Sequence, residues 1–175
     1  MEIRPLRDSD DRKAFRSGDA DLDRFFAKYA GQNQFRHHIG ATHVAIDSER
    51  IVGYATVAAG QLEGESLPAA FRRKLPSYPL PVLRLARLAV DSGVKGQGVV
   101  KALVRHVMLL GLKMSEEYGC VGIVVDAKPG AVDFYSRIGF SALEVVEGHL
   151  PSRPEPQPMF LPLELVAAAL VRPGG

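Results

Sequence analysis

The stretch RLAVDSGVKGQGVVKALVRHVMLLGLKM, residues 87–114, decides how the rest of the sequence is interpreted. An apolar run leads into a loop that holds Gly93, Gly96 and Gly98, and a helical pattern follows directly. Glycines between a buried strand and a helix let a ligand come very close to the backbone, and the free amides at a helix start attract negative charge. The stretch therefore predicts a buried strand, an anion-binding loop and a long helix that ends near Gly119.

The remaining segments predict one sheet with helices packed on it. The predicted strands cover residues 1–6, 42–47, 50–60, 81–91, 120–127, 141–147 and 158–165. The strands at 42–47 and 50–60 are predicted to form a hairpin, and a helix capped by Asp19 or Asp21 precedes them. A short helix is expected at 68–74 and another at 131–138. The fold class is α+β, a mixed sheet of six to seven strands, in one domain over 1–175 with an insert at 61–80 and a tail at 165–175.

Composition excludes several classes of protein. The chain has 175 residues, one cysteine and a net charge of +2, so charge alone does not argue for a nucleic-acid partner. The single Cys120 excludes an internal disulfide and suits a reducing compartment. No apolar run reaches membrane-spanning length, and the charged N-terminus is unlike a signal peptide. A cytoplasmic protein without a membrane partner is expected.

The glycine loop lacks the patterns of nucleotide-hydrolysing and dinucleotide-binding proteins. The loop lacks the Gly-Lys-Ser/Thr sequence of nucleotide-hydrolysing proteins, and it also lacks the G-x-G-x-x-G spacing of dinucleotide-binding proteins. What remains is a pyrophosphate held by backbone amides without a metal, with Lys95 adding a cation at the edge. The alternative is a plain turn, because G-x-G pairs also occur in turns that bind nothing.

A second motif, AVDFYSRIGF at residues 131–140, narrows the choice. With it the chain resembles the Gcn5-related N-acetyltransferase (GNAT) family: the acetyl-coenzyme A motif falls on residues 93–98, and the FY…GF signature on Phe134, Tyr135, Gly139 and Phe140. The resemblance covers the chain from the first strand to the last. It departs from the family pattern at Gly93, where Gln or Arg is expected, and at Val100. These departures leave open a weakened cofactor site.

The resemblance implies an acetyltransferase in which the amine attacks the acetyl thioester directly. Tyr135 would be the general acid that protonates the leaving thiolate. Its alternative is a core aromatic with a hydrogen-bonded hydroxyl. The residues implied in binding acetyl-CoA are Leu88, Ala89, Val90, Lys95, Gly96, Gln97, Gly98, Val99 and Val100.

The FRSGDADLDRFF start and the RLAVD, VDA and LPL segments are similar to a GNAT branch of toxins that acetylate the amino group of aminoacyl-tRNA. This similarity implies an aminoacyl-tRNA substrate, an antitoxin partner and a homodimer, with Arg84 and Arg87 as substrate-binding residues. Arg72, Arg73 and Lys74 could add phosphate contacts, although a solvated charged face is the better explanation for any one of these basic residues. The alternatives are a GNAT enzyme acting on a small-molecule amine or a protein N-terminus, and a binding module that has lost its cofactor.

Other reactive side chains are expected to have structural roles. Cys120 begins an apolar strand and reads as a small buried hydrophobe. His37, His38 and His43 are expected at the surface or in a substrate channel, and no metal is expected because no acidic or cysteine ligand accompanies them. Asp126 closes a strand and reads as a turn or cap residue.

Overall fold

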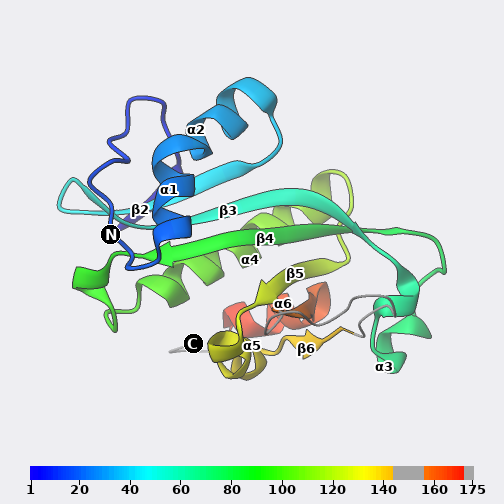
Figure 1. Cartoon of the computed structure of the whole chain (residues 1–175). Helices are drawn as coiled ribbons and strands as arrows, with labels where there is room; N and C mark the ends of the chain where they lie inside the picture. Colours follow the sequence, from blue (N-terminus) through cyan, green and yellow to red (C-terminus); the bar gives the residue numbers. More distant parts are fainter. Residues whose placement is uncertain (144–155, 172–175) are drawn as a thin grey trace. The chain divides into compact units, whose positions relative to one another are not determined.

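The computed structural model describes residues 1–143 and 156–171, and the order of its elements can be followed by colour in Figure 1. Seven strands form one sheet in the order β1-β2-β3-β4-β5-β7-β6, which confirms the predicted mixed sheet. The strands are β1 (Glu2–Pro5), β2 (Ala41–Asp47), β3 (Arg50–Leu62), β4 (Leu80–Val90), β5 (Gly122–Ala127), β6 (Ser141–Ala142) and β7 (Gln157–Pro162). The helices are α1 (Ala20–Lys28), α2 (Ala30–Gln32), α3 (Ala69–Arg72), α4 (Val99–Glu117), α5 (Val132–Ile138) and α6 (Leu163–Val171).

Residue contacts divide the chain into two compact units. The first unit is Met1–Ala58 with Leu85–Val107, and the second is Ala59–Arg84 with Met108–Gly175. The division falls inside β3, β4 and α4, so each of these elements contributes residues to both units. Among the residues described, no helix is both long and apolar enough to cross a membrane.

The hairpin of β2 and β3 is present in the first unit as predicted. The two strands pair antiparallel, with Asp47 opposite Arg50, and a register shift follows Ala45. Ser48 and Glu49 form the two-residue connection with φ angles of 50° and 64°. Such left-handed turns match the twist of paired strands, so the polar DSER segment closes the hairpin without glycine.

Helix α1 begins where the sequence suggested, and Asp19 rather than Asp21 is its N-cap. The Asp19 side chain accepts hydrogen bonds from the amides of Asp21 and Leu22, which satisfies two of the free donors at the helix start. The adjacent residues Phe25 and Phe26 are both buried.

Tyr54 on β3 is the centre of the core beneath α1. It is fully buried, its ring stacks on Phe26 at 4.4 Å between centroids, and its hydroxyl donates to the carbonyl of Leu22 at 2.8 Å. The neighbouring Gly53 points to the other face of the strand, where a Cβ would lie 2.9 Å from Val99 Cγ1. Because successive strand residues face opposite sides, α1 and the start of α4 cover opposite faces of β3 in the first unit.

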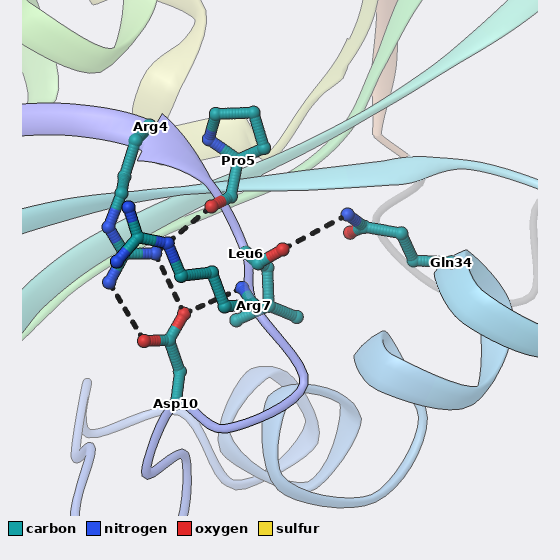
Figure 2. A network of polar contacts seen from close by, with 6 residues as sticks. All are labelled: Arg4, Pro5, Leu6, Arg7, Asp10 and Gln34. Atoms are coloured by element: carbon teal, nitrogen blue, oxygen red, sulfur yellow. Dashed lines mark hydrogen bonds and ion pairs between the residues drawn. The ribbon is translucent and has the colours of Figure 1, made fainter.

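The loop after β1 is held by a charged network, shown in Figure 2. Arg4 makes two hydrogen bonds with the carboxylate of Asp10, at 2.8 and 2.9 Å, and the amide of Arg7 donates to the same carboxylate at 2.7 Å. The Gln34 side-chain amide donates to the carbonyl of Leu6 at 3.4 Å. These contacts hold the pKa of Asp10 below its usual value, chiefly through the Arg4 hydrogen bonds.

The second unit packs around β5 and β7, which pair antiparallel from Gly122–Pro162 to Ala127–Gln157. Val124 and Phe160 belong to its core together with Leu62, Leu67 and Leu80 of the predicted insert at 61–80. A Cβ on Gly122 would overlap the carbonyl oxygen of Leu161, so glycine is required for β5 and β7 to approach.

Three predictions about elements are wrong in part. The last strand ends at Pro162 and α6 begins at Leu163, inside the segment predicted as strand and tail. Strand β6 is only two residues long among the described residues, and the rest of the predicted strand, 144–147, lies outside them. The strand expected to be buried on both faces, β4, exposes Ala86 and Arg87.

Candidate functional site

The loop between β4 and α4 is anchored at its first residue. The amide of Asp91 donates to the carbonyl of Val52 at 2.9 Å, and its carboxylate accepts from the amide of Gly93 at 2.9 Å. Arg50 makes an ion pair with the same carboxylate at 3.1 Å. The next amide, that of Ser92, donates to the carbonyl of Arg16 at 2.9 Å. The base of the loop is therefore fixed to β3 and to the segment before α1.

Beyond this base, several backbone amides at the start of α4 have no hydrogen-bond acceptor among the described residues. Gln97 donates to the carbonyl of Val94 at 3.3 Å, and the first helical bond runs from Ala102 to Gly98 at 3.1 Å. Within residues 1–143 and 156–171, the amides of Gly96, Gly98, Val99, Val100 and Lys101 donate no hydrogen bond. This set of donors at the positive end of α4 is suited to a phosphate group.

Two of the three glycines are required by the backbone. Gly96 and Gly98 have φ angles of 81° and 84°, a region that other L-residues rarely adopt. A Cβ on either residue would meet no atom within 4 Å, so both face open space. Gly93 is different, because a Cβ there would lie 3.1 Å from the Asp91 carboxylate that accepts its amide. Gly96 and Gly98 are thus explained by their backbone conformation, and Gly93 by its close contact with Asp91.

The other predicted cofactor residues differ in what they present. Ala89 and Val90, at the end of β4, have buried side chains, and Val99 is buried at the start of α4. Only their backbone groups remain for a ligand. Lys95 and Gln97 are exposed in the loop, while Leu88 and Val100 are partly exposed.

The two predicted substrate arginines have different partners. In the second unit, Arg84 makes an ion pair with the exposed carboxylate of Asp126 at 3.4 Å. In the first unit, the guanidinium carbon of Arg87 lies 3.8 Å from the ring centroid of Phe25. In the part of the chain that the structure describes, Arg87 has no carboxylate partner.

Arg87 also lines a pocket that the sequence did not suggest. The pocket has a volume of about 230 Å³ and lies between α1 and β4. Its lining residues are Asp21, Leu22, Arg24, Phe25, Tyr29 and Arg87. The apolar residues of α1 indicated a helix but no pocket, and Tyr29, which follows α1, is 47% exposed.

Tyr135 lies in α5 of the second unit and has a buried ring, and its hydroxyl has no partner among the described residues. The side chain is 6% exposed and packs edge-on against Phe134 and Phe140, both at 5.2 Å between centroids. No described residue hydrogen-bonds to its hydroxyl, yet the oxygen is not among the fully buried unpaired atoms. Burial raises the pKa of Tyr135 to about 12. The phenol therefore keeps its proton at neutral pH and has it available to donate, unlike a core tyrosine with a satisfied hydroxyl.

The remaining reactive side chains are only partly as expected. Cys120 is buried and its thiol donates to the carbonyl of Gly122 at 3.2 Å, while burial raises its pKa. His37 and His38 are exposed, but His43 is buried, so its predicted place at the surface is wrong. The alternative place in a substrate channel stays a prediction. Its Nδ1 lies 2.8 Å from Nε2 of His106 on α4, a partner that the sequence gave no reason to choose. Burial lowers the pKa of both rings, that of His43 to about 4.

The cofactor residues 88–90 and 95–100 and Arg87 all belong to the first unit. Tyr135 and Arg84 belong to the second unit. Among the residues that the structure places, no group of three or more His, Cys, Asp or Glu side chains could hold a metal ion.

Comparisons with known proteins agree with these features. Residues 13–148 match the family model described as an acetyltransferase (GNAT) domain. A tRNA-acetylating toxin of Mycobacterium tuberculosis strain H37Rv is 32% identical over 126 residues, which are 71% of this chain and 74% of that protein. A structure of AtaT complexed with acetyl-methionyl-tRNAfMet is similar with a TM-score of 0.82 and 28% identity, over 95% of this chain and 97% of that one. A structure of AtaTR bound with AcCoA is similar with a TM-score of 0.76 and 28% identity, over 95% of this chain and 96% of that one.

Proposed function

This chain belongs to the GNAT family of acetyltransferases, and we propose that it transfers the acetyl group of acetyl-CoA to the α-amine of an aminoacyl-tRNA. In this proposal the chain acts as one domain, in the cytoplasm, as the toxin of a toxin–antitoxin pair. The cofactor assignment rests on the backbone amides at the positive end of α4 that donate no hydrogen bond to any described residue. They are the amide of Gly96 and the four amides of residues 98–101. The similarity to a tRNA-acetylating toxin supports the choice of acceptor.

The free amides hold the pyrophosphate of acetyl-CoA, and the glycine conformations at positions 96 and 98 allow it to approach the backbone. Lys95, exposed in the same loop, adds a positive charge at the edge. Because Ala89 and Val90 have buried side chains, they contribute through backbone groups of β4 that align the pantetheine arm. The missing side chain at Gly93 matters little in such a site, since its amide is already bound to Asp91.

Acetyl-CoA supplies the thioester. The acceptor nitrogen forms a bond to the acetyl carbon, and the carbon–sulfur bond breaks as the tetrahedral intermediate collapses. Tyr135 holds the proton for this step at its phenolic oxygen and gives it to the departing thiolate, forming the free thiol of CoA. The amine attacks in its neutral form, and its nitrogen, which is positively charged after the attack, loses a proton to solvent. Solvent returns a proton to the Tyr135 phenolate, so that the next turnover can begin.

Arg84 and Arg87 serve the acceptor side in this proposal. Arg87 is the stronger candidate because it has no carboxylate partner among the described residues, whereas Arg84 is already paired with Asp126. A homodimer and an antitoxin partner complete the proposal, both by analogy with toxins of this kind.

The test is acetyl transfer to a defined set of acceptors. The protein is incubated with labelled acetyl-CoA and, in parallel, charged tRNA, uncharged tRNA, small primary amines and peptides with free N-termini. We expect acid-precipitable label only with charged tRNA, and mild base should release it as an N-acetyl amino acid whose chromatography identifies the residue carried.

Tyr135→Phe is the control that ties the label to this site. Label on small amines or peptides alone would overturn the tRNA acceptor and leave a GNAT enzyme with another substrate. A failure to bind acetyl-CoA would instead identify a binding module that has lost its cofactor.

A further inference from the structure

The pocket between α1 and β4 has a rigid base. Leu22 and Phe25 lie one helical turn apart on α1 and form its apolar wall. The Leu22 carbonyl accepts the hydroxyl of the fully buried Tyr54, whose ring also packs 6.3 Å from Phe25. The wall of the pocket is therefore held in place before any ligand arrives.

Arg87 brings to this pocket a positive charge that makes no ion pair with any described residue. Its guanidinium lies over the Phe25 ring, which fixes one face of the group and leaves the N–H edge available. Arg50 and Arg24 are each paired with an aspartate, but Arg87 has no such partner within the described residues. A guanidinium held on an aromatic ring presents its donors in a plane that matches phosphate oxygens.

Tyr29 provides an exposed aromatic side chain at the end of α1. An exposed ring beside an unpaired arginine is the combination by which proteins bind unpaired nucleotides, with the base on the ring and the phosphate on the cation. Asp21 also lines the pocket, but its exposed carboxylate is paired with Arg24 at 3.0 Å, which reduces its repulsion of a phosphate.

The size of the pocket favours one end of a larger ligand. Its volume of about 230 Å³ is below the roughly 300–1,000 Å³ of pockets that enclose a whole small ligand. A small acid would use Arg87 and leave Leu22 and Tyr29 uncovered. One nucleotide at the end of a strand uses the ring, the apolar wall and the cation together, while the rest of the strand lies outside.

We propose that this pocket binds the unpaired 3′-terminal nucleotide of the acceptor RNA, with its base on Tyr29 and its phosphate on Arg87. This inference rests on the proposed function, because it assumes that the acceptor is an RNA end. It adds the surface and the two contacts that recognise that end.

The test uses two RNA hairpins, one ending in a single-stranded 3′-ACCA and one with a blunt end. Binding of each uncharged hairpin is measured by fluorescence anisotropy with acetyl-CoA at saturation, so that the adenine nucleotide of the cofactor cannot be the species detected. We expect Tyr29→Ala to weaken binding of the ACCA hairpin about tenfold, and Tyr29→Phe, which keeps the ring, to recover that loss. Arg87→Gln should weaken it similarly and reduce the salt slope by about one unit.

Binding of the blunt hairpin should change little in either variant. Arg7→Gln, which removes the charge of an exposed arginine in the loop after β1, is the matched control. Both Tyr29 and Arg87 are exposed, so thermal unfolding should show folded variants. Equal losses for the two hairpins, or none for the ACCA hairpin, would overturn the pocket assignment.

The two proposals fail in different ways. If the parent protein acetylates charged tRNA but Tyr29→Ala and Arg87→Gln bind the ACCA hairpin like the parent, only the pocket assignment fails. If the parent acetylates no charged tRNA and binds neither hairpin, the RNA acceptor fails and the pocket assignment falls with it.

Discussion

Replacing Gly98 with alanine tests two roles of this glycine separately. Its backbone conformation affects the stability of the fold, and the space beside it affects the affinity for acetyl-CoA. Gly98 has a φ of 84°, and a Cβ there would meet no atom within 4 Å. The folded protein therefore suffers no clash, and the cost is the left-handed conformation itself, about 1–2 kcal/mol for an L-residue. The lower entropy of alanine in the unfolded chain offsets about 0.4–1 kcal/mol of that cost. We expect Gly98→Ala to lower the free energy of unfolding by about 1 kcal/mol.

The effect on cofactor binding should be larger than the effect on stability. Gly98 belongs to the set of amides without an acceptor among the described residues, and its added methyl group would occupy the open space beside them. We therefore expect it to keep a pyrophosphate from its donors. Hydrogen bonds to charged groups contribute about 1.5–3 kcal/mol each, so losing one raises the dissociation constant of acetyl-CoA about tenfold to a hundredfold. Isothermal titration calorimetry measures this constant, and urea unfolding measures the stability.

Two other glycines provide matched controls. Gly119, after α4, has a φ of 102° and only an ordinary contact with Pro81, so Gly119→Ala should lose similar stability without losing acetyl-CoA affinity. Gly130 has open space and no left-handed φ, so Gly130→Ala should be neutral in both measurements. If Gly98→Ala binds acetyl-CoA as well as Gly119→Ala does, the anion site is not at the start of α4.

Further predictions concern a catalytic group, a buried pair and an ion pair. Tyr135→Phe should lower turnover by about 10²–10⁴-fold with little change in acetyl-CoA affinity, and a fully active variant would remove the tyrosine from the mechanism. Because burial raises the pKa of Tyr135 to about 12, the parent should lose no turnover through deprotonation of this phenol below pH 10. Because burial lowers the pKa of His43 from 6.5 to about 4, the stability that depends on its neutral form is present above pH 6.5 and lost as the pH falls toward 4, by up to about 3 kcal/mol at about 1.36 kcal/mol per pKa unit. Urea unfolding at pH 7, 5.5 and 4.5 measures this loss, and His43→Gln should reduce its slope; an unchanged slope would contradict the assignment. Asp10→Asn should cost about 2 kcal/mol at pH 7, and the difference from the parent should vanish as acid protonates Asp10, whose pKa lies below its usual value; a gap that persists at pH 2 would show that the charge is not the cause.

Local patterns were sufficient where neighbouring residues determine the structure. The two-residue turn between β2 and β3, the Asp19 cap of α1 and the glycine loop before α4 each depend on residues within a few positions of one another. The resemblance based on residues 93–98 and 134–140 predicted a family that the match over residues 13–148 confirms. The roles given to individual residues in that motif stay predictions.

Features that join distant residues could not be predicted in this way. His43 and His106 are 63 positions apart, and nothing in either segment distinguishes this pair from exposed histidines. The pocket combines α1 with Arg87 of β4, and an arginine in an apolar strand gave no sign that Phe25 would lie beneath it. Helix α6 was missed because the run from Leu163 to Val171 is apolar at almost every position and has no polar face to show a helical period.

The anchoring of Asp91 has a consequence for the kinetics of cofactor association. Its amide, its carboxylate and the amide of Ser92 tie the base of the loop to Val52, Arg50 and Arg16. An incoming pyrophosphate then meets donors that are already oriented, and little conformational entropy is lost on binding. Observed association rates for acetyl-CoA should rise linearly with concentration and show no plateau from a slow closing step, and Asp91→Ala should introduce such a plateau by leaving the loop to order itself around the ligand.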